Sequence, residues 1–227
     1  MNKQPVLYLQ TDPRWANKDY SAPGESTTIG KSGCGPTCAA MLVETLTGRT
    51  FTPADACAWA LQKGYKAPHQ GTYYSYFVPQ FQAFGVKCER LNGVSLYGSP
   101  ASSLHTEAFD LLKQGYYLIA CMGPGTWTTG GHFVVVWWED GWVRINDPAS
   151  QATARVKGNL TTFQKEVKYY WAIDAREHNK DELAEAVDKL YKAGVINSPD
   201  YWKQGKGYSD ANVVALIKKV SALCGNM

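Results

Sequence analysis

The chain has 227 residues, a length that allows one full domain with a small appendage and argues against two full-sized domains. Hydrophobic residues make up 44% of the chain and charged residues 19%, a composition that excludes wholesale disorder. The net charge is +3 without a basic run, so no nucleic-acid partner is expected. The longest apolar run, Phe133 to Trp138, is far shorter than the ~20 residues that cross a bilayer, so no membrane span is expected.

The first predicted element is a helix that Gly35 and Pro36 open and Gly48 ends, because proline suits the first helical turn and glycine the position after the last. Apolar residues on nearly all its sides predict a central, buried helix. The remaining periodicity predicts two more helices and then four strands, over 52–63 and 104–114 and over 116–121, 132–138, 142–146 and 167–173. A central helix followed by an antiparallel sheet predicts an α+β fold.

The composition changes near residue 175, where a polar bridge over 174–180 leads into a segment with purely helical periodicity. One amphipathic helix is predicted from Asp181 to Gly194. A short second helix begins after the cap-then-proline sequence 197–200, and Ser209 caps a third. The sequence therefore predicts a main domain over 1–175 and a small module of three helices over 176–227.

The cysteines stand at positions 34, 38, 57, 88, 121 and 224, a low density with no paired spacing of the zinc-ribbon kind. Free thiols are therefore expected, and neither a metal ion nor another cofactor is predicted. A disulfide between Cys57 and Cys88 is the alternative.

Cys34 lies at the amino end of the predicted central helix, with a glycine on each side that leaves the sulfur accessible. Unpaired N–H groups and the helix dipole favour a thiolate at that position, and a lowered thiol pKa is the first requirement of a nucleophilic cysteine. A buried cysteine in a tight turn is the alternative interpretation. Cys38, one turn further along, is predicted to be a core residue, or else a thiol that resolves an oxidised Cys34.

A nucleophilic thiol also needs a base, and the chain has four histidines. Three of them, His69, His105 and His178, lie in polar contexts, and a solvated surface position is predicted for each. His132 differs, because it follows a glycine-rich loop and begins an apolar strand. A polar residue there is either a hydrogen-bonded core histidine or part of a site.

The hairpin between the two middle strands allows a geometric test. With a two-residue turn at 140–141, position 139 pairs with 142 and Asp147 lies opposite Val134. Because side chains alternate along a strand, His132 and Asp147 share one face, with backbones about 7–8 Å apart. The carboxylate is predicted to orient the imidazole through its Nδ1 atom. Asn146 is the alternative orienter, although residue parity puts it on the opposite face.

Four motifs in this order resemble the C39-like cysteine peptidases of the papain-like superfamily. They are Leu9 to Trp15, Ser32 to Met41, Gly131 to Val136 and Ile145 to Pro148. The resemblance implies a papain-like fold, with Cys34 as nucleophile, His132 as general base and acid, Asp147 as orienter and Gln10 as a side-chain oxyanion donor beside the Cys34 N–H. Without the resemblance, Gln10 would be interpreted as an exposed polar residue.

Within this family the chain is most similar to stand-alone domains of bacterial and phage cell-wall lysins, because it has neither the membrane spans nor the ATPase of the exporter members. The tail resembles short helical modules at the carboxyl ends of such lysins. These resemblances imply a bacteriolytic, phage-type endolysin that hydrolyses the peptide part of peptidoglycan. The alternatives are acyl transfer to an amine, a peptidase that processes proteins or leader peptides, and a non-catalytic wall-binding protein with a vestigial site.

The amino terminus has no long apolar stretch and no small-residue cleavage site, so a secretory signal is not predicted. The protein is therefore expected to be cytoplasmic and to act on the wall after release. The tail helices are expected to bind wall polymer or to self-associate, with simple packing on the first domain as the alternative.

Aromatic residues near the predicted site are candidates for the walls of a substrate cleft, because aromatic faces bind sugars and extended peptides. The candidates are Trp127 and the cluster that contains Tyr73, Tyr74, Tyr76 and Phe77. Gly131, directly before the predicted base, is a further candidate. The alternative is that about half of these rings belong to the ordinary core.

Overall fold

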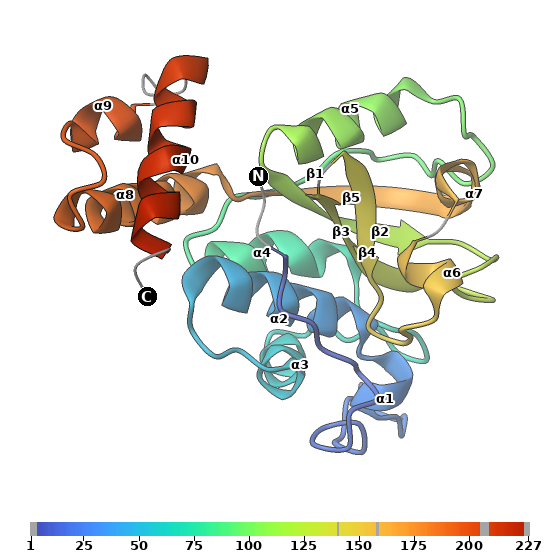
Figure 1. The fold of residues 1–227 in the computed structure, drawn as a ribbon. Coiled ribbons are helices and arrows are strands. Elements are labelled where there is room, and N and C mark those ends of the chain that lie inside the picture. The colour runs from blue at the N-terminus through green and yellow to red at the C-terminus, as the bar shows by residue number, and fades with distance from the viewer. Residues whose placement is uncertain (1–3, 140, 158, 205–208, 225–227) are drawn as a thin grey trace. The chain divides into compact units, whose positions relative to one another are not determined.

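The computed structural model describes residues 4–139, 141–157, 159–204 and 209–224, and the chain divides into two compact units, Met1–Ala175 and Arg176–Met227. The first unit is a mixed fold in which helices cover an antiparallel sheet (Figure 1). The second unit consists of helices only in its described part. The α+β class predicted for the first unit agrees with this arrangement.

The sheet has five strands in the order β1-β5-β2-β3-β4, and every neighbouring pair is antiparallel. Its strands are β1 (Cys88–Arg90), β2 (Tyr116–Met122), β3 (His132–Glu139), β4 (Trp142–Asn146) and β5 (Val167–Asp174). The four predicted strands are present within one residue of their expected ends. The three-residue edge strand β1 was not predicted, because so short a segment shows no periodicity.

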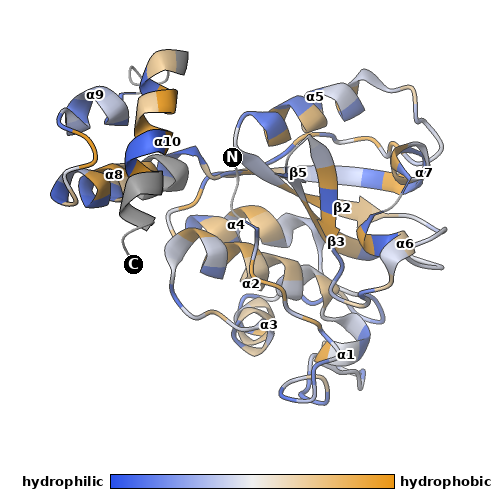
Figure 2. Cartoon of the chain, in the orientation of Figure 1, coloured by the Kyte–Doolittle hydropathy of each residue, from blue (hydrophilic) through white to orange (hydrophobic). Residues whose placement is uncertain are grey.

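Two hydrophobic cores lie on the two faces of the sheet, because successive side chains of each strand point to opposite faces. Residues such as Ile119 and Val135 pack with one set of helices, and their neighbours Leu118 and Val134 pack with another. The first set comprises α2 (Cys34–Thr47), α3 (Pro53–Gln62) and α4 (Phe77–Gln82), and the second comprises α5 (Ser103–Lys113) and α7 (Leu160–Glu166). Figure 2 shows the predominantly hydrophobic colour of β2 and β3 between these layers.

The helix α2 is the central helix that the sequence predicted. Nearly all of its residues are buried. It ends where Gly48 adopts the left-handed conformation with φ of 65°, and the Gly48 N–H donates to the carbonyl of Glu44. The amino end of α2 lies beside the first residues of β3, because Gly35 packs against the ring of Phe133.

Several short helical elements were not predicted. They are α1 (Ile29–Ser32), η1 (Tyr74–Tyr76), α4, α6 (Thr153–Val156) and α7. Each is too short for a reliable periodic pattern, and in α4 the proline at position 79 also argues against a helix. Among the helices in the described part of the chain, none is long and apolar enough to cross a membrane.

The second unit contains α8 (Arg176–Lys192), α9 (Pro199–Lys203) and α10 (Asp210–Cys224). The predicted polar bridge over 174–180 is wrong in part, because α8 begins five residues before Asp181. Arg, Glu and Lys are good helix formers, so a polar segment without an apolar stripe still continues a helix. Val187, Val195 and Ile196 form a small core in this unit.

The five cysteines whose side chains the structure describes are free thiols. The alternative of a disulfide between Cys57 and Cys88 is therefore wrong. Cys57 is fully buried in α3, whereas Cys88 lies in the edge strand β1.

Candidate active site

Cys34 is the first residue of α2 and follows α1 with Gly33 between the two helices. A Cβ atom at Gly33 would lie 2.7 Å from the carbonyl oxygen of Ile29, so no side chain fits there. At Gly35, a Cβ atom would lie 3.3 Å from side-chain atoms of both Phe133 and Thr72. Gly33 therefore lets α1 pack closely against the start of α2, and Gly35 lets β3 and the loop that contains Thr72 approach Cys34 closely.

The surroundings of Cys34 favour ionisation of its thiol. Burial raises its pKa, but the hydrogen bond and charge of His132 and the backbone N–H groups of Phe133 and Gly35 lower it, and the net pKa lies below 9.0. The buried thiol of Cys38 shows the contrast, because burial raises its pKa well above 9.0. Cys38 is thus a core residue without thiolate character, which disfavours the alternative role of resolving an oxidised Cys34.

The hairpin of β3 and β4 has the predicted register. Glu139 pairs with Trp142, and Asn146 pairs with Val135. The predicted turn residue at position 140 lies outside the described residues. His132 Nε2 lies 2.7 Å from Asp147 Oδ1, so the two side chains meet on one face as the alternation of the strands requires.

The nitrogen predicted for this contact is wrong, because Asp147 meets Nε2 and not Nδ1. Nε2 is the ring nitrogen farther from the backbone, which suits a contact across the diagonal between neighbouring strands. Nδ1 is thereby left for the hydrogen bond with Cys34. Asn146 is on the opposite side, where its amide donates to the carbonyl of Pro5 at 3.3 Å.

His132 is poised to carry a positive charge. Burial lowers its pKa, but the hydrogen bonds to Asp147 and Cys34 and the charges of those two groups raise the pKa to about 9. A depressed thiol pKa beside a raised imidazole pKa favours a thiolate–imidazolium pair in the resting site.

Asp147 is fully buried and both of its oxygens are engaged. Oδ1 also accepts a hydrogen bond of 2.8 Å from the backbone N–H of Ala149, and Oδ2 lies 2.5 Å from Arg155 Nε. Arg155, in the short helix α6, also donates to the carbonyl of Trp127 at 2.7 Å. Sequence reasoning missed Arg155. A buried carboxylate needs more than one partner, so a search for a cation near Asp147 in the sequence could have found Arg155, which follows eight residues later.

Trp127 does not line the cleft, so its predicted role as a substrate wall is wrong. Only 2% of its surface is exposed, and its indole N–H donates to the carbonyl of Arg155 at 3.0 Å. Its ring packs edge-on against Phe163 in the core beneath α7. Its hydrogen bonds with Arg155 and its packing against Phe163 hold the ring in the core.

Gln10 is buried rather than exposed, which corrects the interpretation from its position alone. Its backbone N–H donates to the carbonyl of Pro148 at 2.8 Å, directly after Asp147. Its side-chain amide donates to the carbonyl of Gly30 at 2.9 Å, in α1 just before Cys34. Gln10 therefore connects the segment of Asp147 with the approach to Cys34.

Two hollows meet at Cys34. The aromatic hollow has a volume of about 460 Å³ and is lined by Tyr73, Tyr74, Phe133, Cys121 and Lys168. The polar hollow, of about 610 Å³, is lined by Glu25, Ser26, Thr27, Lys31, Ser32 and His69. Both also share Cys34, Gln70, Gly71 and Gly131. The structure thus brings three of the predicted cleft residues together around the sulfur, whereas Tyr76 and Phe77 are fully buried core.

The remaining histidines differ from one another. His105 is buried, with hydrogen bonds to the Tyr170 hydroxyl and the Ser99 carbonyl, so its predicted surface position is wrong. His69 is exposed as predicted, at the rim of the polar hollow. The side chain of His178 lies outside the described residues. Among the described side chains, no three of His, Cys, Asp or Glu come together as metal ligands.

The model of the Peptidase_C39 like family matches residues 10–179. The chain belongs to this family. A protein from Bacillus anthracis, whose crystal structure is described as that of a C39-like peptidase, has 14% sequence identity and a TM-score of 0.42, over 75% of this chain and 98% of that chain. No curated protein matches the sequence significantly. The part of this C39-like chain that matches contains Gln10, Cys34, His132 and Asp147, and α9 and α10 lie outside it.

Proposed function

We propose that the chain is a cysteine peptidase with a papain-like catalytic unit, which hydrolyses amide bonds through a thioester on Cys34. The observation that carries the proposal is the chain of contacts at the meeting point of two hollows. A thiol with a lowered pKa contacts an imidazole whose pKa is raised to about 9, and a fully buried carboxylate contacts that imidazole.

In the first half of the reaction, the Cys34 thiolate attacks the carbonyl carbon of the scissile amide. The developing oxyanion is stabilised by the backbone N–H of Cys34 in the first turn of α2 and by the Gln10 amide. The imidazolium of His132 gives its Nδ1 proton to the leaving amine, the C–N bond breaks, and a thioester on Cys34 remains.

In the second half, neutral His132 takes a proton from water as the water oxygen attacks the thioester carbonyl. The C–S bond breaks, the carboxylic acid leaves, and the thiolate–imidazolium pair is restored. Asp147 keeps the ring oriented throughout, because its Oδ1 holds Nε2. Transfer to an amine follows the same path when an amine replaces water.

The proposed substrate is the peptide part of bacterial peptidoglycan, and the proposed role is that of a phage-type endolysin. Two features support it: the resemblance of the chain to stand-alone C39-like domains of lysins, and the presence of a separate helical unit after the catalytic one. In that unit α10 exposes Val214 and Ile217, apolar residues suited to self-association or to contact with wall polymer. Tethering by this unit would raise the local concentration of enzyme at the wall.

The test uses the full chain on purified cell walls from several Gram-positive genera, followed by turbidity and by released amino groups. The wild type is expected to release amines from at least one wall, and Cys34→Ala is expected to release none. Cys88→Ala is the matched control, because it removes a half-buried thiol in β1, away from the two hollows.

The outcomes separate the alternatives. Cleavage of a Gly-Gly peptide without release from any wall would favour a leader-peptide or protein-processing peptidase. Binding to walls without turnover, together with no labelling of Cys34 by iodoacetamide at neutral pH, would favour a non-catalytic wall-binding protein. Full activity of Cys34→Ala would overturn the catalytic assignment.

A further inference from the structure

The two hollows beside Cys34 carry positive charge on both sides. Lys31, near the end of α1, lines the polar hollow, and Lys168, in β5, lines the aromatic hollow. Neither lysine forms an ion pair with a carboxylate of the described residues. Glu25 is the one acid among the described residues that line either hollow. Whether Lys31 and Lys168 are compensated therefore depends on whether the Glu25 carboxylate already has other partners.

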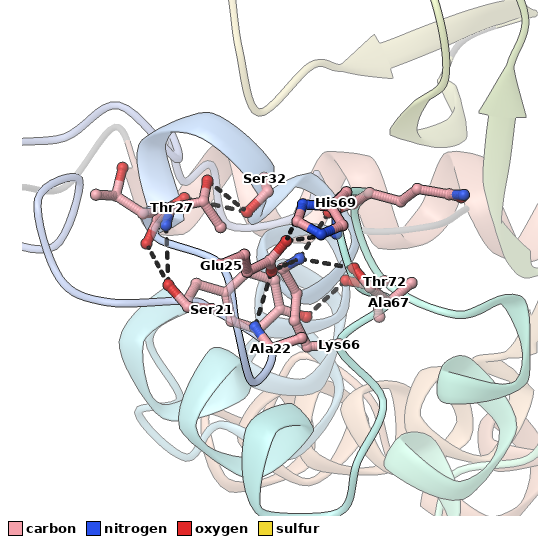
Figure 3. Close-up of polar contacts among 12 residues, drawn as sticks. Ser21, Ala22, Glu25, Thr27, Ser32, Lys66, Ala67, His69 and Thr72 are labelled. Carbon is pink, nitrogen blue, oxygen red and sulfur yellow. Dashed lines mark hydrogen bonds and ion pairs between the residues drawn. The ribbon is translucent and has the colours of Figure 1, made fainter.

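The carboxylate of Glu25 is already occupied, as Figure 3 shows. One oxygen accepts from Lys66 Nζ and from the backbone N–H of Ala22, and the other accepts from the backbone N–H of His69. The Glu25 side chain is 6% exposed and that of Lys66 is 2% exposed. Lys66 Nζ also donates to the carbonyls of Ala67 and Gln70 at 2.8 and 2.7 Å. The charges of Glu25 and Lys66 thus neutralise each other, and Glu25 does not compensate the charges of Lys31 and Lys168.

The same pair fixes the rim of the polar hollow. Glu25 belongs to the loop between Asp19 and Thr28, and Lys66 and His69 belong to the loop that leads to Thr72. His69 is the one non-glycine residue with positive φ, 56°, among the described residues, and its backbone N–H is held by Glu25. Such a conformation persists where the surroundings determine it, and such positions gather at ligand sites.

We propose that the polar hollow is a binding subsite for a carboxylate of the substrate, with Lys31 as its charged partner and the exposed hydroxyl of Ser26 as a hydrogen-bond donor. This inference rests on the proposed function and narrows it. The substrate class is an acidic peptide with a free carboxylate next to the scissile amide. Stem peptides with free carboxylates fit it, and their amidated forms do not. Lys168 adds to the attraction from the other side of Cys34.

A first experiment needs no cleavable substrate. Iodoacetate and iodoacetamide both alkylate a thiolate, because the sulfur forms a bond to the methylene carbon as iodide leaves, but only iodoacetate carries a carboxylate. The rate with iodoacetate divided by the rate with iodoacetamide measures the attraction of the cleft for a carboxylate. Both rates are followed by mass spectrometry of the Cys34 peptide. In Lys31→Gln this ratio is expected to fall by at least about twofold, with a smaller fall in Lys168→Gln.

Lys63→Gln is the matched control. It removes the same charge from an exposed position after α3, outside both hollows, and is expected to leave the ratio unchanged. An unchanged ratio in both cleft variants, or an equal fall in Lys63→Gln, would overturn the carboxylate subsite.

A second experiment compares cleavage of two peptides that differ only in a carboxylate or an amide next to the scissile bond. The wild type is expected to prefer the acidic peptide, through a lower KM, and Lys31→Gln is expected to lose that preference while it still cleaves the amide. Equal cleavage of both peptides by the wild type would contradict the subsite. Cleavage of neither peptide, with a rate ratio that still depends on Lys31, would count against the proposed peptidase activity and not against the subsite.

Discussion

Two buried carboxylates lie near Cys34 and are paired in different ways. Asp147, on the hairpin side, is fully buried and contacts one group that can change its protonation, His132, and one that cannot, Arg155. Glu25, on the loop side, is held by Lys66 and by backbone N–H groups. A carboxylate that contacts a titrating imidazole can influence proton transfer by that ring. A carboxylate whose oxygens are bound by a lysine and by backbone N–H groups stabilises the local fold instead.

The comparison implies that the two sides of the cleft respond differently to substitution. On the hairpin side, changes should reduce turnover more than binding. On the loop side, changes should alter the shape and charge of the cleft, and therefore KM and stability. The following experiments are arranged from the largest expected effect to the smallest.

His132→Ala should have the largest effect, because it removes the proposed base and the group that lowers the pKa of Cys34. The kcat for peptide cleavage is expected to fall by about 10³- to 10⁴-fold or more. Thermal unfolding by circular dichroism checks that the fold is kept. Retention of more than a tenth of the wild-type kcat would contradict the assignment of His132 as acid and base.

Trp127→Ala should have a large effect on stability without a matching effect on substrate binding. The ring is buried against Phe163, so its removal is expected to cost about 3–5 kcal/mol of unfolding free energy. The measurement is urea unfolding, together with KM below the transition. A raised KM with unchanged stability would return Trp127 to the wall of the cleft.

Arg155→Met should lower kcat by about 10- to 100-fold, because Arg155 holds Asp147, and the loss of a residue that orients a functional side chain typically has an effect of that size. The loss of a positive charge beside Asp147 should also let that carboxylate favour the imidazolium more strongly. The alkaline limb of the kcat profile is therefore expected to move above the His132 pKa of about 9. A purely structural arginine would lower stability and leave that limb in place, and Arg155→Lys should recover part of kcat.

Glu25→Gln should have the smallest effect on kcat, and its effect on stability should disappear in acid. Lys66 and the backbone donors lower the pKa of Glu25 from 4.5 to about 2. Because the folded-state pKa is the lower one, the pair stabilises the fold above about pH 4.5, and this stabilisation is lost as pH falls towards 2. The difference in Tm between the wild type and Glu25→Gln is expected to shrink over that range. A constant difference would show that the charge of Glu25 is not what matters.

The same two sides differ in how far they could be predicted from sequence. On the hairpin side, strand alternation and a two-residue turn are local patterns, and these patterns alone predict that His132 and Asp147 share one face. The choice of Nε2 depends on the reach of the ring across the diagonal, which residue parity does not determine. Arg155 was missed because it lies in a four-residue helix without periodicity.

On the loop side, the contacts join residues about 40 positions apart, and no local pattern relates Glu25 to Lys66. The aromatic residues show the same limit. Tyr73 and Trp127 both stand in polar or glycine-rich surroundings, yet Tyr73 lines the cleft and Trp127 is core. Which of two rings turns inward is decided by tertiary packing, here by the paired hydrogen bonds of Trp127 with Arg155.

The most direct test of the proposed nucleophile is the pH dependence of Cys34 alkylation by iodoacetamide, in the wild type and in His132→Ala. In the wild type, alkylation is expected to titrate with an apparent pKa below 9.0, because His132 and the backbone donors stabilise the thiolate. In His132→Ala burial is expected to prevail, and the titration should move above 9.0. The same titration in both proteins, at or above 9.0, would contradict the thiolate–imidazolium pair.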